Sequence, residues 1–146
     1  MAIPVIVCGQ TEQIGTGVVQ GLKPDIEVVF FHLSSGDAKD ELSSVLKGKL
    51  PENPASSLGS GDLSTPPKAV VLGGAFDLET VESMQKSINE VPGVVMVPWL
   101  MFDKEKPSPP IGPEYGKHVV GRVKETLLGM EKEGKLDAGD GGIFKY

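Results

Sequence analysis

The chain has 146 residues, 39% of them hydrophobic and 23% charged, a composition typical of one globular domain rather than of a disordered chain or a coiled coil. Its 14 Lys and Arg and 20 Asp and Glu residues give a net charge of −6 without a basic cluster, which argues against nucleic acid or an anionic membrane surface as a partner. A single cysteine, short apolar runs and the lack of a basic N-terminal region predict a cytoplasmic protein without an internal disulfide, a membrane span or a signal peptide.

Along the chain, apolar runs typical of strands buried on both faces alternate with segments of helical periodicity. Ser35 and Asp77 are expected N-caps, Pro113 suits the first position of a helix, and Lys23-Pro24 and Gly48 are stop signals. The expected strands lie at 3–8, 26–32, 69–74 and 94–97. A helix follows each strand. The apolar stripes of the four helices are Ile14, Val18, Val19 and Leu22; Ala38, Leu42, Val45 and Leu46 in a short helix; Leu78, Val81, Met84 and Ile88; and Val119, Val123, Leu127 and Met130 in a last helix that runs to about Gly134.

Three segments are rich in loop-forming residues. Eleven of the twenty residues at 48–67 are Gly, Pro or Ser, so this segment is either mobile or laid over the surface. The Pro-rich stretch at 103–113 is either a semi-rigid lid or a spacer. The Gly-rich tail at 137–142 leads to Ile143, Phe144 and Tyr146, which could pack on the sheet edge or on the partner chain of a homodimer.

This order of elements predicts a single α/β domain over 1–146, a three-layer Rossmann-like or flavodoxin-like fold. About four parallel strands are expected in the order 2-1-3-4, with helices on both faces. The ligand crevice of such a fold lies at the carboxyl ends of the first and third strands, where the strand order reverses.

The segment at 7–19 resembles the opening of NAD(P)-binding Rossmann proteins, most closely the extended and atypical short-chain dehydrogenase/reductase branch with its G-x-x-G-x-x-G loop. Gly9 and Gly15 match the first and third glycines of that loop, and Gly73-Gly74 resembles the end of a later strand in the same proteins. Glu12 replaces the middle glycine, and at about 4 Å and an effective dielectric near 20 its carboxylate would repel a phosphate by about 4 kcal/mol. Either Glu12 turns to solvent or the ligand is not a dinucleotide bound in the usual way. The alternative to a ligand site is a turn whose glycines serve packing alone.

Other loops at this edge extend the candidate site. His32 stands where NAD binders carry an acid for the ribose. Two alternatives follow. This histidine could hold a 2′-phosphate together with Ser34, Ser35 and Lys39, which favours NADP, or these residues could form a solvated loop. Trp99 either lines a pocket or belongs to the core. The candidate cofactor-binding residues are Gly9, Thr11, Glu12, Gln13, Ile14, Gly15, His32, Ser34, Gly73, Gly74 and Trp99.

Candidate catalytic groups gather at the start of the last helix. Tyr115 and Lys117 lack the spacing of the Tyr-x-x-x-Lys pair, since residues two apart on a helix lie on different faces. Glu114 and His118 share a face and could act as an acid/base pair, although Glu114 also suits a helix N-terminus electrostatically. Two histidines and one cysteine predict no metal cluster.

The second half of the chain, at 97–117, resembles a group of small fungal proteins with no assigned activity. The leading hypothesis is therefore a Rossmann-like protein that binds NADP or another phosphate-bearing ligand at the first turn; if it is an enzyme, an NADP-linked oxidoreductase is expected. In a reductase, Glu114, Tyr115 or His118 would have to serve as the acid. The alternatives are a non-catalytic interaction module with a decayed nucleotide site, and a small isomerase or hydrolase that uses the Glu114/His118 pair.

Overall fold

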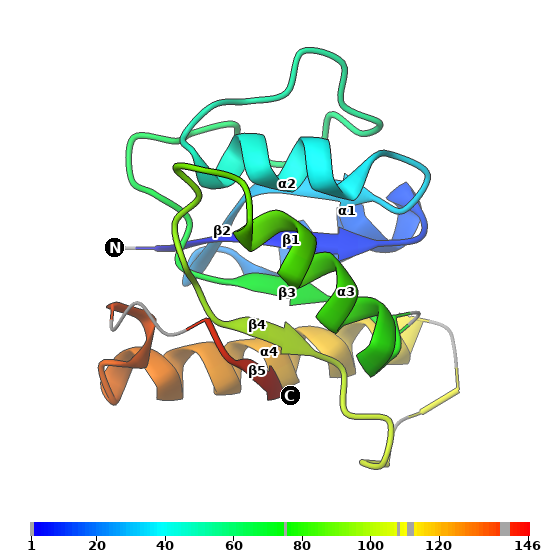
Figure 1. Cartoon of the computed structure of the whole chain (residues 1–146). Helices are drawn as coiled ribbons and strands as arrows, with labels where there is room; N and C mark the ends of the chain where they lie inside the picture. Colours follow the sequence, from blue (N-terminus) through cyan, green and yellow to red (C-terminus); the bar gives the residue numbers. More distant parts are fainter. Residues whose placement is uncertain (1, 75, 108, 111–112, 138–140) are drawn as a thin grey trace.

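The computed structural model describes residues 2–74, 76–107, 109–110, 113–137 and 141–146. Within these ranges, five strands form one parallel sheet in the order β2-β1-β3-β4-β5 (Figure 1). The strands are β1 (Ile3–Gly9), β2 (Ile26–Leu33), β3 (Val70–Leu72), β4 (Trp99–Met101) and β5 (Ile143–Lys145), and the helices are α1 (Glu12–Leu22), α2 (Ala38–Leu46), α3 (Leu78–Asn89), α4 (Pro113–Lys132) and the short 3-10 helix η1 (Lys135–Asp137).

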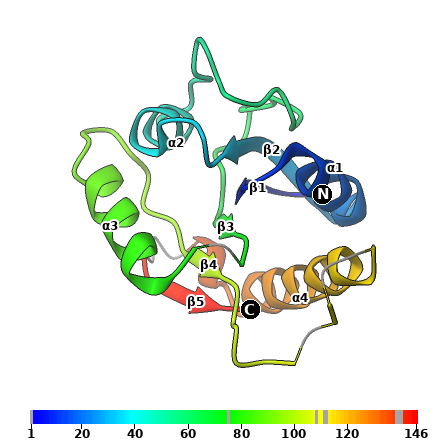
Figure 2. The same ribbon diagram turned by 90° about the vertical axis from the view of Figure 1, so that its right-hand side faces the viewer.

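Helices α1 and α4 cover one face of the sheet, and α2 and α3 cover the other (Figure 2). This arrangement confirms the three-layer α/β class and the order of the first four strands, to which β5 adds a fifth. The amphipathic faces read from the sequence explain it, because each helix buries one apolar stripe on a sheet whose strands are apolar on both sides. Among the helices that the structure describes, none combines the length and apolar content needed to cross a membrane.

The helix starts depend on short polar side chains, as expected. Thr11 Oγ1 accepts a hydrogen bond from the Ile14 backbone N–H (3.3 Å) at the start of α1. The predicted cap Asp77 is confirmed, since its Oδ1 accepts from Thr80 N at 2.8 Å. The predicted cap Ser35 is wrong: Asp37 caps α2. The reason is the turn after β2, in which Gly36 N donates to Leu33 O and delays the start of the helix.

The predicted strand at 94–97 is also wrong, because the fourth strand begins at Trp99, opposite Val70 of β3. The β-branched segment before it is a connection, in which Val95 N donates to Leu46 O (3.2 Å) at the end of α2. Val95 and Met96 are consequently exposed on the surface instead of buried in the sheet. Leu78, placed by periodicity on the inner stripe of α3, is exposed as well.

Residues 48–67, which we call the strap, lie over the surface along the outer edge of β2. Ser60 N and Gly61 N donate to Val28 O and Val29 O, each at 2.9 Å. Gly59 has φ +103, and a Cβ added there would stand 2.9 Å from Val29 O, so this close approach requires glycine. The strap therefore covers an edge that would otherwise offer unpaired backbone groups to other chains.

The C-terminal apolar residues pack on their own sheet. Strand β5 pairs with β4, so the sheet-edge alternative for Ile143 and Phe144 is confirmed. Tyr146 is 1% exposed, and its hydroxyl donates to Leu72 O at 2.5 Å. Burial raises the pKa of this hydroxyl, which keeps it a donor at neutral pH.

Candidate functional site

A cavity of about 280 Å³ lies at the carboxyl ends of β1 and β3, on the side covered by α1 and α4. This is the position that the strand order predicts for a ligand, because β1 connects outward to β2 while its other neighbour is β3. We call it the inner cavity. Its walls are mostly apolar, and the lining residues are Val7, Cys8, Gly9, Gln10, Ile14, Gly15, Val18, Phe31, Val71, Gly73, Gly74, Phe76, Tyr115, Val119, Val123 and Tyr146.

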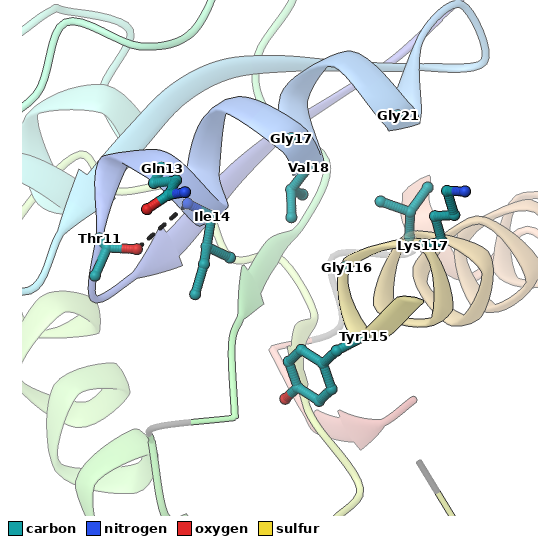
Figure 3. A pocket seen from close by; sticks show the side chains of 10 residues that line it. Thr11, Gln13, Ile14, Gly17, Val18, Gly21, Tyr115, Gly116 and Lys117 are labelled. Atoms are coloured by element: carbon teal, nitrogen blue, oxygen red, sulfur yellow. Dashed lines mark hydrogen bonds between the residues drawn. The ribbon is translucent and has the colours of Figure 1, made fainter. Parts of the chain in front are cut away.

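A second space of about 730 Å³ lies between α1 and the first turns of α4 (Figure 3). We call it the outer groove. Side chains of α1 project across it toward α4, and Tyr115 stands on the opposite side. It is lined by Thr11, Gln13, Ile14, Gly17, Val18, Gly21, Tyr115, Gly116, Lys117 and Val120.

The two glycines that match the dinucleotide loop both pack against the ring of Phe31. A Cβ added to Gly9 would stand 3.0 Å from Phe31 Cζ, and one added to Gly15 would stand 2.7 Å from the same atom. The turn therefore needs these glycines whether or not a phosphate binds to it. Sequence reasoning missed Phe31 as their partner, because nothing in its spacing from the turn signals the contact.

The start of α1 presents polar groups to solvent. Thr11 uses its hydroxyl as the helix cap, and Gln13 stands near it at one end of the outer groove (Figure 3). Glu12 is exposed in the first turn of α1, where a carboxylate is favourable to the helix dipole. The geometry thus corresponds to the alternative in which Glu12 turns to solvent.

His32 lies on the opposite face of the sheet from the cavity and is 2% exposed. Its Nδ1 lies 2.7 Å from Glu41 Oε1, and the other carboxylate oxygen, Oε2, accepts from Ala55 N of the strap at 3.0 Å. Ser34, Ser35 and Lys39 are exposed whereas His32 is buried, so the structure does not bring together the four groups expected around a 2′-phosphate.

Cys8 and the candidate residue Trp99 both pack in the core under the α2–α3 face. Cys8 is 1% exposed; burial raises the pKa of its thiol, and the Glu41 carboxylate raises it further, so the thiol stays protonated at neutral pH. Trp99 is fully buried beside Val70 and packs in the same core. Its placement corresponds to the core alternative, and it is not among the described residues that line the inner cavity.

The start of α4 contributes one of its three catalytic candidates to the cavity. Glu114 forms an exposed ion pair with Lys117 (3.7 Å), while His118 Nε2 lies 3.4 Å from Arg122 Nη1. Glu114 and His118 therefore have different partners. Tyr115 is half-buried and lines both spaces, with its hydroxyl 3.0 Å from the position that a Cβ of Gly74 would occupy.

Arg122, which was not among the candidates from the sequence, holds Tyr146 in place beside the inner cavity. Its Nη2 donates to the backbone oxygens of Asp103 (2.8 Å) and Tyr146 (2.6 Å). Its guanidinium carbon lies 4.3 Å from the centre of the Phe102 ring, a cation–π contact. These contacts fix Tyr146, whose ring helps to close the inner cavity.

The described lining of the inner cavity supplies apolar contacts and a few hydrogen-bonding groups. None of these residues is Asp, Glu, His, Lys or Arg, and the lining groups that can exchange a proton are Cys8, Tyr115 and Tyr146. In the described part of the chain, no three His, Cys, Asp or Glu side chains gather as metal ligands. What remains is an apolar space with a few polar groups, chiefly Gln10 and the Tyr115 hydroxyl.

Fold and cavity together define a three-layer parallel α/β protein with a ligand-sized space at the reversal of strand order. Comparison with known proteins finds no matching family profile. It also finds no matching solved structure. The chain is, however, 34% identical over 137 residues to the Kojic acid related protein 6 of Aspergillus oryzae, an alignment that covers 92% of this chain and 82% of the relative. It therefore belongs to the family of that fungal protein. The likeness of residues 7–19 to short-chain dehydrogenases remains a local resemblance.

Proposed function

We propose that this protein binds a small, uncharged and largely apolar organic molecule in the inner cavity. The observation that carries the proposal is the cavity itself, a mostly apolar space at the reversal of strand order. Mostly apolar pockets with a few polar groups, placed at such a reversal, are the usual form of small-molecule sites in α/β proteins.

The size of the cavity indicates a single substituted ring. Its volume of about 280 Å³ is near the lower end of ligand pockets, which span roughly 300–1,000 Å³. A cavity of about 150 Å³ is enough for benzene. The Tyr115 hydroxyl and the Gln10 side chain are suited to hydrogen-bond one or two oxygens on the ring. The name of the Aspergillus relative refers to kojic acid, a six-membered ring that bears such oxygens, which makes kojic acid a rational first probe.

A nucleotide such as NADP at the first turn is the second candidate. Its support is the resemblance of the turn and the start of α1, whose backbone N–H groups and dipole attract phosphate. The burial of His32 argues against it, because it removes a donor expected at the 2′-phosphate. Enzymatic activity, a partner protein and a homodimer have no comparable support in the geometry.

Thermal unfolding with added ligands tests the proposal. Kojic acid and phenol at 1 mM are expected to raise the melting temperature by a few degrees if their Kd is about 0.1 mM, since tenfold saturation adds about 1.4 kcal/mol. NADPH, FMN, ADP and sugar phosphates form the second arm. If nucleotides raise the melting temperature and ring compounds do not, nucleotide binding replaces the first proposal.

A pair of matched variants locates the binding. Val119 and Val19 are both half-buried and pack against the same core, but only Val119 lines the inner cavity. Val119→Phe should fill the cavity and abolish the ligand-induced shift, while Val19→Phe should retain it. An equal shift in both variants would show that the ring binds elsewhere.

A further inference from the structure

The inner cavity and the outer groove are neighbouring spaces with shared walls. Ile14 and Val18 from α1 and Tyr115 from α4 line both of them. Figure 3 shows Ile14 and Val18 directed from α1 toward the space that the Tyr115 ring faces. Among the described lining residues, these three are the ones that the two spaces share, so the spaces adjoin at Ile14, Val18 and Tyr115.

The outer groove is open because glycines stand where α1 approaches α4. A Cβ added to Gly17 or Gly116 would meet nothing within 4 Å. The helices come into contact at Gly21, where an added Cβ would lie 3.0 Å from Val120 Cγ2. The two helices pack together at Gly21 and Val120, and the groove lies between them along the rest of its lining.

The surface of the groove is predominantly apolar. Ile14 is 49% exposed, and Val18 and Val120 continue the apolar wall. Among the described lining residues only Lys117 is charged; its side chain is 78% exposed and is paired with Glu114 at 3.7 Å. A hydrocarbon chain would bury this surface without leaving a charge unpaired.

We infer that the ligand is elongated: a ring in the inner cavity that carries an unbranched alkyl or prenyl chain, with the chain lying in the outer groove. This inference rests on the proposed function. The shared walls support it, because one molecule of this shape occupies both spaces, whereas a docked protein segment would cover the groove and leave the inner cavity without contents. The chain would pass between Ile14 and Tyr115.

A homologous series of 4-alkylphenols, from phenol to 4-heptylphenol, measures the contribution of the chain. Each methylene buried in the groove should tighten the Kd by about fourfold, from the transfer free energy of a CH₂ group. Titration calorimetry on the whole chain supplies the Kd values.

Two helical glycines provide a test variant and its control. Gly17→Leu, on α1, should place a side chain in the groove. Gly121→Leu, on α4, should place a side chain outside both spaces. Both positions are exposed and sterically open, so both variants should fold. The inference expects the dependence on chain length to persist in Gly121→Leu and to disappear in Gly17→Leu, with the affinity for phenol retained in both.

The outcomes separate the inference from the proposed function. If phenol binds and the Kd is independent of chain length or of Gly17→Leu, the elongated ligand is overturned while the ring site stands. If neither kojic acid nor any alkylphenol binds, the proposed function fails and the inference fails with it. If linear alkanoic acids bind as tightly as alkylphenols, and Val119→Phe leaves that binding intact, the groove acts without the cavity and the arrangement proposed here is wrong.

Discussion

The two faces of the sheet share the same strands and are each covered by two helices, but they differ in what they enclose. On the α2–α3 face, His32, Glu41, Cys8 and Trp99 are all buried, and the first two are bonded to each other. On the α1–α4 face, the outer groove lies between parts of the two helices and the inner cavity lies at the strand ends. The residues with the richest chemistry are therefore on the closed face, and the space for a ligand is on the open one.

This difference shows why reactive side chains are a poor guide to the site in this protein. A histidine beside a carboxylate is a common catalytic arrangement, but here both groups are buried and serve to hold the strap to β2 and α2. The inner cavity has instead a tyrosine hydroxyl, an amide and apolar walls. Binding by shape and burial is what such a lining can provide.

The strongest test of the closed face is Glu41→Ala. It leaves His32 buried without its partner and removes the acceptor of the Ala55 N–H. Removing one partner of a buried pair usually costs about 3–5 kcal/mol, and we expect a loss in that range by urea denaturation. Limited proteolysis within the strap should also become faster. A loss below about 1 kcal/mol would mean that the pair does not hold this face together.

The matched control replaces both members of the pair. His32→Leu combined with Glu41→Leu removes both buried polar side chains of the pair together, although the Ala55 N–H still loses its acceptor. Since apolar replacements of whole buried pairs are often neutral or stabilising, the double variant should be more stable than Glu41→Ala. The reverse order would assign the effect to lost packing.

A closely packed position on the α1–α4 face is tested by Gly15→Ala. The new Cβ would stand 2.7 Å from Phe31 Cζ, and overpacking of this kind costs about 1–3 kcal/mol, against a gain of about 1 kcal/mol in helix propensity. We expect a net loss of up to about 2 kcal/mol in the free energy of unfolding. In the background of Phe31→Leu the loss should shrink, because the clashing ring atoms are absent. An unchanged loss in that background would show that Phe31 is not the reason for the glycine.

Much of the fold could be predicted because it depends on local patterns. The doubly apolar strands and the helical stripes determine the class and the order of the first four strands. The failures came where a long-range contact decided the outcome: the segment at 94–97 has the composition of a strand, but Val95 bonds to the end of α2 instead. The fifth strand follows a Gly-rich tail, and only its pairing with β4 distinguishes it from a partner-binding tail.

The site could be located from the sequence but not described from it. The reversal of strand order predicted its position, and Gly9, Ile14 and Tyr115 do line it. Its other walls come from elements far apart in the chain, such as Phe31 and Tyr146, whose contributions no motif signals. Gly9 and Gly15 indicated a phosphate site by their match to the dinucleotide loop. Their packing against the Phe31 ring is sufficient to explain why both positions are glycine.

The pH dependence of stability tests how completely the closed face excludes water. Burial raises the pKa of the Cys8 thiol, so the folded chain keeps a proton that the unfolded chain loses above about pH 8.5. Stability is therefore fully present below that pH and falls as the pH rises, by about 1–2 kcal/mol at pH 10 for this group. Urea denaturation at pH 8 and pH 10 should show the fall, and Cys8→Ala should reduce it. An equal fall in Cys8→Ala would assign the dependence to other groups, the buried Tyr146 hydroxyl among them.

The smallest expected effect comes from the open face and has the opposite sign. Gly17 lies in the middle of α1, and an added Cβ would meet nothing within 4 Å, so Gly17→Ala should stabilise the fold by about 0.5–1 kcal/mol through helix propensity alone. Gly15→Ala, two residues earlier in the same helix, is expected to destabilise it, so the pair compares the packed and open positions directly. Urea denaturation of the two variants would measure both changes. If Gly17→Ala also destabilised the protein, α1 and α4 would pack more closely in solution than the outer groove requires, and the difference between the two faces would be smaller than the structure indicates.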